Sequence, residues 1–229
     1  MKAAAKKAAP PLEDLIEELD FEQRSDDWYE ARLGICTASS FSAIMASGRD
    51  GGDSKMRAKL LHRMAAEIIF KRPMETFSNA AMDSGIEMEP KALDHYAFTR
   101  NVVVRRVGFV RRTVRRPLYG DFIVGCSPDG LVGDDGVVEI KRMQPDLILQ
   151  LQDSGRFPSE HRWQCHGELW VTGRKWNDLK FYYDEFPISP TFRIERNEAL
   201  IAQIRNEVEV FNHELHELVK RSRVKGGLK

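Results

Sequence analysis

Apolar residues recur every three to four positions in several segments of the chain, which is the period of an amphipathic helix. The first such segment, residues 12–19, follows two prolines and predicts a short helix. The next stretch predicts a helical turn, a break at Gly34, and a second helix that begins near Thr37 or Ser39. Further helices are predicted at 55–70, 84–99, 160–172 and 195–221.

Between these helices the chain changes to β-branched and aromatic residues. Residues 102–131 are rich in Val and Phe and are interrupted by Gly and Pro, which predicts consecutive strands. Residues 137–142 and 178–184 predict two more strands. Helices on both sides of a central group of strands predict an α/β (α+β) fold, in which helices flank a central mixed sheet.

One predicted strand carries charges where an apolar strand would be expected. Side chains alternate along a strand, so Glu139 and Lys141 share one face while Val138 and Ile140 point to the other. Two charges on a central strand oppose burial unless they have a partner or a function. Considered alone, this strand is also compatible with a simple ion pair.

A second carboxylate precedes that strand in the sequence SPDG. Pro128 and Gly130 restrict the backbone around Asp129, so its carboxylate is held at the end of a strand. Two carboxylates from adjacent strand ends can share Mg²⁺, which takes oxygen ligands and keeps several waters. A lysine two residues after Glu139 can act on a water at the metal and stabilise charge on a phosphate. Together these residues predict a metal-dependent site for phosphate chemistry.

Four blocks of sequence together indicate a known family. An Asp followed by Glu-x-Lys resembles the PD-(D/E)xK nuclease core. MDSGIEMEPKALDHY resembles the upstream helix that supplies an acidic residue, and HRWQCHGELWVTG the downstream helix that carries a glutamine. With W-x-x-x-R-L-G-x-x-T-A-S at residues 28–39, these blocks resemble the lambda exonuclease family, the YqaJ-type viral recombinase nucleases. The resemblance runs from about Asp26 to Tyr183.

The resemblance implies roles for the metal site. Asp129 and Glu139 would hold Mg²⁺, for which Mn²⁺ is a possible substitute, and the carbonyl of Ile140 would complete a site. Lys141 would position the attacking water.

The two flanking helices would contribute further catalytic residues. Glu89 matches the helix carboxylate, and Glu87 is the competing candidate because residues two apart on a helix point in different directions. Gln164 matches the first glutamine of the family's usual Q-x-Q. His166 stands where the second glutamine is expected, which leaves its role open.

Other matched positions concern the DNA. Arg32, Ser39 and Ser127 match a pocket that binds the 5′-phosphate of the strand being digested, as expected for a guanidinium beside hydroxyl groups. Arg49 and Met82 match positions that contact the duplex and separate its terminal base pair. Taken singly, Arg32 is more typical of a surface charge and Ser39 of a helix cap, and Met82 is equally typical of core packing.

The resemblance implies a magnesium-dependent 5′→3′ exonuclease that digests one strand of linear double-stranded DNA from its 5′-phosphorylated end. It would release 5′-mononucleotides and leave 3′ overhangs for phage-type recombination with a single-strand annealing protein. A ring-shaped homotrimer enclosing the DNA is implied, in the cytoplasm of a bacterium carrying the phage or prophage. The alternative is a sequence-specific PD-(D/E)xK endonuclease.

Composition adds little to this picture. The chain has 229 residues with 35 basic and 35 acidic ones, so net charge gives no indication of a polyanionic partner. Seven arginines nevertheless crowd residues 100–116. They are compatible with a charged sheet edge, or with a basic track for a DNA strand.

The remaining features concern domain organisation and location. We expect residues 1–11 to be a flexible tail and residues 12–229 to form one exonuclease domain. No apolar run approaches the ~20 residues of a membrane span, so no membrane contact is expected. Three cysteines without C-x-x-C spacing argue against a disulfide scaffold or zinc site, and we expect them to be buried: Cys36, Cys126 and Cys165.

Overall fold

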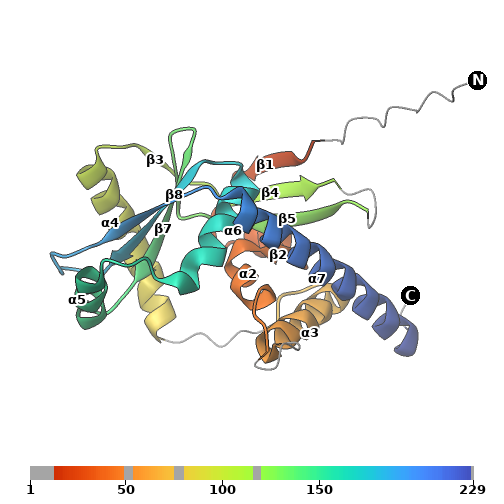
Figure 1. Ribbon diagram of the computed structural model, residues 1–229. Helices are drawn as coiled ribbons and strands as arrows, with labels where there is room; N and C mark the ends of the chain where they lie inside the picture. Colours follow the sequence, from red (N-terminus) through yellow and green to blue (C-terminus); the bar gives the residue numbers. More distant parts are fainter. Residues whose placement is uncertain (1–12, 49–53, 75–79, 116–119, 228–229) are drawn as a thin grey trace, which may run out of the picture.

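The computed structural model describes residues 13–48, 54–74, 80–115 and 120–227, and of residues 80–87 it describes the backbone alone. Helices flank two β-sheets (Figure 1). The predicted tail and Arg49 lie outside the described residues, as do the side chains of Met82 and Glu87. The predicted α/β class is confirmed, although the strands form two mixed sheets rather than one.

The first sheet has four strands and packs against the largest hydrophobic core. Its order is β1 (Leu15–Leu19), β4 (Phe109–Val114), β5 (Phe122–Cys126) and β2 (Cys36–Thr37). β2 pairs with β5 in parallel, and the other pairs are antiparallel.

The second sheet has five strands and carries Glu139 and Lys141. Its order is β3 (Val104–Arg105), β6 (Gly130–Val132), β7 (Gly136–Arg142), β8 (Trp176–Tyr182) and β9 (Thr191–Glu195). β7 and β8 are parallel, and the other pairs are antiparallel. β5 ends at Cys126 and β6 begins at Gly130, so Asp129 lies in the connection between the two sheets.

The helices cover these sheets from several sides. They are α1 (Asp26–Arg32), α2 (Ala38–Ile44), α3 (Lys55–Phe70), α4 (Ala80–Arg100), α5 (Pro145–Ser154), α6 (Arg162–Thr172) and α7 (Glu198–Lys225), with a short 3₁₀ helix at Ser159–His161. In Figure 1, α6 occupies the centre, with α3 and α7 on one side and α4 and α5 on the other. Leu93 and Tyr96 of α4 pack against Val138 of β7, on the face opposite Glu139. Since α6 contacts both sheets as well as α2, it can bring residues of each together.

The helix predicted over residues 12–19 is wrong, because Leu15–Leu19 is strand β1. This strand pairs antiparallel with β4, in a register that sets Glu17 opposite Arg111. The spacing of its apolar residues is helical, but pairing with a distant strand outweighs that weak local preference.

The same pairing accounts for much of the arginine run. Four of its described members form ion pairs with acidic residues, three of which belong to β1 or directly precede it. The pairs are Arg105–Glu18, Arg111–Glu17, Arg112–Asp14 and Arg115–Asp121. This arrangement favours the charged sheet edge over a basic track for DNA.

Helix α5 and strand β9 were not anticipated from the sequence, whereas α3, α6 and α7 lie close to their predicted positions. All three cysteines are free and buried, as expected. In the described part of the chain, no helix is long and apolar enough to cross a membrane.

Candidate active site

Strand β7 presents the two charged residues on one face, as its alternation predicts. The Lys141 ammonium donates a 2.7 Å hydrogen bond to Glu139 Oε1. Glu139 is only 4% exposed, while Val138 on the opposite face lies in a hydrophobic cluster. Burial lowers the pKa of Lys141, but the carboxylates of Glu139 and Asp129 outweigh that effect and raise it overall. Lys141 is therefore charged at neutral pH.

The connection between β5 and β6 holds Asp129 against β7. Its Oδ2 accepts a 2.6 Å hydrogen bond from the backbone N–H of Ile140, the residue between Glu139 and Lys141. Burial and the negative charges of Glu139 and Glu89 raise the pKa of Asp129 well above its ordinary value, against the opposing charge of Lys141. Asp129 therefore belongs to a crowded group of carboxylates.

Helix α6 brings Gln164 to this group. Gln164 Nε2 donates to Glu139 Oε1 at 2.6 Å and to Glu168 Oε1 at 2.9 Å. Glu168 is a buried carboxylate that our sequence analysis missed. Its spacing was the available signal, since a residue four positions after Gln164 lies on the same helix face. Burial, followed by the charge of Glu139, raises the pKa of Glu168 well above its ordinary value.

His166 does not join the site. It is buried, it does not line the cavity that contains Gln164, and its Nδ1 has no hydrogen-bond partner. Burial lowers its pKa, and the positive charges of Arg162 and Arg196 lower it further. The second position of the Q-x-Q motif therefore points away from the carboxylates in this chain.

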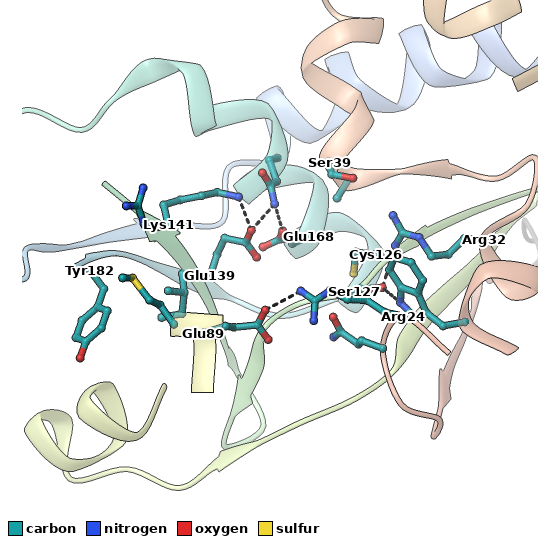
Figure 2. Close-up of a pocket in the computed structure, with 17 residues that line it drawn as sticks. Arg24, Arg32, Ser39, Glu89, Cys126, Ser127, Glu139, Lys141, Glu168 and Tyr182 are labelled. Carbon is teal, nitrogen blue, oxygen red and sulfur yellow. Dashed lines mark hydrogen bonds and ion pairs between the residues drawn. The ribbon is translucent and has the colours of Figure 1, made fainter. Parts of the chain in front are cut away.

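Helix α4 contributes Glu89. Its carboxylate accepts a 2.9 Å hydrogen bond from Arg24 and lines the same cavity as Glu139. Arg24 has a φ of 72°, in the left-handed region that disfavours most residues other than glycine. Of the two candidates on α4, Glu89 is the one whose described side chain lies at the cavity (Figure 2).

The residues predicted to bind a terminal phosphate also come together. Ser127 Oγ accepts hydrogen bonds from Arg32 Nη1 at 2.9 Å and from Trp28 Nε1 at 2.8 Å. The Arg32 guanidinium lies 4.1 Å from the centroid of the Trp28 ring. Burial lowers the pKa of Arg32 to about 10, which still leaves it charged at neutral pH. Trp28 is a further site residue that the motif contained but to which we assigned no role.

One cavity of about 530 Å³ joins the two groups. Figure 2 shows Lys141, Glu139 and Glu89 toward one end, and Arg32 and Ser127 toward the other. Ser39 of α2 and Ile140 line it as well. Asp129 lines a neighbouring cavity of about 190 Å³, and Arg24 and Glu89 belong to the walls of both.

The carboxylates fit a magnesium ion better than a metal bound entirely by protein. Among the described residues, no group of three or more His, Cys, Asp or Glu side chains is placed to hold a metal. Mg²⁺ needs only one or two carboxylates, because it retains water ligands. Glu139 Oε2 is buried without a hydrogen-bond partner, and Asp129 is crowded by like charges. A bound cation would give Glu139 Oε2 a partner and would offset the negative charges around Asp129.

Comparison with known proteins identifies the family. Residues 27–175 match the model of the YqaJ-like viral recombinase domain. The chain belongs to this family. The family resemblance inferred from the sequence is thus confirmed. A search of the curated proteins finds no match to the chain.

Solved structures agree with this assignment. An alkaline exonuclease, LHK-Exo from Laribacter hongkongensis, is 30% identical with a TM-score of 0.76, covering 89% of this chain and 98% of that one. The complex of LHK-Exo with dAMP matches with the same TM-score and coverage at 31% identity. A phage-related exonuclease from Haemophilus somnus 129PT is 15% identical with a TM-score of 0.59, covering 82% of this chain and 96% of that one, and shows the fold alone.

Proposed function

We propose that this family member is a magnesium-dependent 5′→3′ exonuclease, which digests one strand of linear double-stranded DNA from its 5′-phosphorylated end. DNA exonuclease activity itself follows from the family and from the likeness to LHK-Exo. The metal, the polarity and the preference for a terminal phosphate are the proposed part.

One observation carries the proposal. A single cavity connects a cationic, hydroxyl-lined end to a carboxylate-lined end. Arg32 and Ser127 offer a guanidinium and a hydroxyl, which suit a phosphate monoester. The next phosphate along the strand would then lie toward Glu139 and Lys141. Cleavage there would release a 5′-mononucleotide, and the complex of LHK-Exo with dAMP supports such a product.

The residues of the chain have separable tasks in this reaction. Asp129, Glu139 and the carbonyl of Ile140 would hold magnesium, which when bound polarises a phosphoryl oxygen and lowers the pKa of a water. Lys141, held by Glu139, would orient the attacking water and stabilise the negative charge that develops on the phosphate. Arg32 would fix the strand end, so that the scissile bond reaches the carboxylates in register.

Assembly and partners complete the proposal. The family resemblance implies a ring-shaped homotrimer enclosing the DNA, a single-strand annealing protein as partner, and action in the cytoplasm of a bacterium that carries the phage or prophage. Mn²⁺ would substitute for Mg²⁺, since both prefer oxygen ligands.

Defined DNA substrates test the proposal against a sequence-specific endonuclease, which has no terminal phosphate to bind. Wild-type protein should degrade 5′-phosphorylated linear duplex much faster than the 5′-hydroxyl duplex, and should leave a closed circle intact. Arg32→Ala should slow only the phosphorylated substrate, by about ten- to a hundredfold, because a hydrogen bond to a charged group contributes roughly 1.5–3 kcal/mol.

Arg111→Ala is the matched control. It removes an arginine that is paired with Glu17 on the β1–β4 edge and does not line the cavity. It should retain the wild-type preference. Equal cutting of circles and linear DNA would favour the endonuclease, and equal treatment of both ends would remove the phosphate pocket from the proposal.

A further inference from the structure

We infer that Glu168 is a positioning residue for the nuclease reaction, which fixes the amide of Gln164 so that Gln164 can orient Glu139. The inference rests on the proposed function of the cavity. It assigns a task to a buried carboxylate that the family motif, as we read it from the sequence, does not include.

The hydrogen bonds of Gln164 determine its orientation. Its Nε2 lies 2.6 Å from Glu139 Oε1 and 2.9 Å from Glu168 Oε1, so both amide hydrogens are committed to carboxylates. If the amide were turned over, its carbonyl oxygen would face two acceptors and neither contact would be a hydrogen bond. Glu168 therefore selects one orientation of Gln164.

Glu168 is itself held from the neighbouring strand. Asn177 of β8 donates a 2.7 Å hydrogen bond to Glu168 Oε2. Glu168 is 2% exposed, and none of the ion pairs of the described residues includes it. Burying a carboxylate without an ion pair is costly, and a hydrophobic residue of similar size would serve packing alone at least as well. A task beyond packing explains the charge better.

The orientation of Gln164 in turn fixes the carboxylate of Glu139. Its Oε1 accepts hydrogen bonds from both Gln164 and Lys141, whereas its Oε2 is buried without a partner. The two donors hold the carboxylate so that Oε2 remains free for a cation. The contacts thus form a continuous series, in which Asn177 holds Glu168, Glu168 holds Gln164, and Gln164 holds Glu139 (Figure 2 draws the last two).

Glu168→Gln is the informative substitution, because it preserves size. The introduced amide has one acceptor for two donors, so Gln164 or Asn177 must lose its partner or turn over, and an overturned Gln164 releases Glu139. With the 229-residue chain, total nucleotide release from linear duplex in Mg²⁺ should show kcat lowered about tenfold or more, with KM for DNA unchanged. A change confined to KM would overturn the inference.

A double-mutant cycle with Gln164→Ala tests whether Glu168 acts through Gln164. In the Gln164→Ala background, Glu168→Gln should change kcat less than about twofold. Multiplicative effects would mean that Glu168 acts independently, for instance as a direct metal ligand, and would also overturn the inference.

Two further variants separate positioning from stability. Tyr96→Phe removes a buried 2.7 Å hydrogen bond to Asp178 on the opposite face of β8, so it should lower the melting temperature but leave kcat unchanged. Asn177→Ala frees Glu168 without replacing its carboxyl group, and should lower kcat in the same direction even if Glu168→Gln folds poorly.

The outcomes distinguish this inference from the proposed function. If wild-type protein does not degrade linear duplex, the proposed function fails. If wild-type protein degrades it but Glu168→Gln and Asn177→Ala retain wild-type kcat, only the positioning role fails.

Discussion

Asp129→Asn should make the metal-free protein more stable while abolishing cleavage. The Asp129 carboxylate lies among the negative charges of Glu139 and Glu89, and burial together with these charges raises its pKa well above its ordinary value. Asparagine keeps an oxygen for the 2.6 Å hydrogen bond from the Ile140 N–H. The substitution therefore removes the charge while retaining the contact.

The expected gain is moderate. A buried polar group without full compensation costs about 1–3 kcal/mol. For a chain of this length each kcal/mol corresponds to roughly 2–4 °C in melting temperature, so we expect a rise of about 2–12 °C in EDTA. A carboxyl group whose pKa is raised in the folded state destabilises that state above its unfolded pKa. The gain should therefore shrink as the pH falls toward 3.8, the ordinary value for Asp.

Asp178→Asn provides a matched contrast on β8. Asp178 is also buried, but it accepts hydrogen bonds from Arg193 at 2.8 Å through both oxygens and from Tyr96 at 2.7 Å. Loss of its charge weakens those bonds, so this variant should lose about 1.5–3 kcal/mol. Two Asp→Asn substitutions should thus change the stability of the metal-free protein in opposite directions.

Thermal melts with EDTA and with excess Mg²⁺ measure both effects. Magnesium at a hundred times its dissociation constant would stabilise wild-type protein by about 2.7 kcal/mol, and Asp129→Asn should lose most of this shift. The reasoning is refuted if Asp129→Asn lowers the EDTA melting temperature as Asp178→Asn does. An equal magnesium shift in wild type and Asp129→Asn would remove Asp129 from the proposed metal site.

Substitutions at three other positions test separate parts of the structure. Lys141→Ala should lower the cleavage rate by several orders of magnitude yet retain the thermal shift with Mg²⁺. Lys141→Arg should restore little activity, because a planar guanidinium does not replace a compact ammonium. Full activity in Lys141→Arg would mean that a positive charge is the sole requirement at this position. Gly167→Ala should lower stability by about 1–3 kcal/mol in thermal melts, because its Cβ would lie 2.4 Å from the Phe41 ring between α6 and α2. Arg111→Ala should change stability by less than about 1 kcal/mol, since its ion pair with Glu17 is partly exposed. A larger loss in the same melts would mean that the β1–β4 edge depends on this pair.

Features that depend on local geometry were predicted correctly from the sequence. Alternation along a strand places Glu139 and Lys141 on one face, and the structure joins them by a hydrogen bond. The helical periods of α3, α6 and α7 likewise predicted these elements. Such properties depend on residues close together in the chain, so no knowledge of distant partners was needed.

Features that depend on distant partners in the chain were not predicted correctly from the sequence. Residues 15–19 have helical spacing, yet they form β1 because β4 offers a strand partner, in a register that sets Arg111 opposite Glu17. The run of arginines was compatible with a charged sheet edge or with a basic track for DNA, and the fold favours the edge because it supplies an acid for several of its members.

The features of the candidate site also divide into those that the sequence predicts and those that depend on distant partners. The amino-acid sequence by itself determined which residue types are present at the spacing of a nuclease core, including Asp129, Glu139, Lys141 and Gln164. Only the tertiary structure decided that Glu168, rather than His166, lies beside Gln164 at the carboxylates, because α6 turns one face toward β7 and β8. Hydrogen bonds between residues far apart in the chain, such as the one that Arg32 donates to Ser127, exist only once packing has brought their elements within bonding distance.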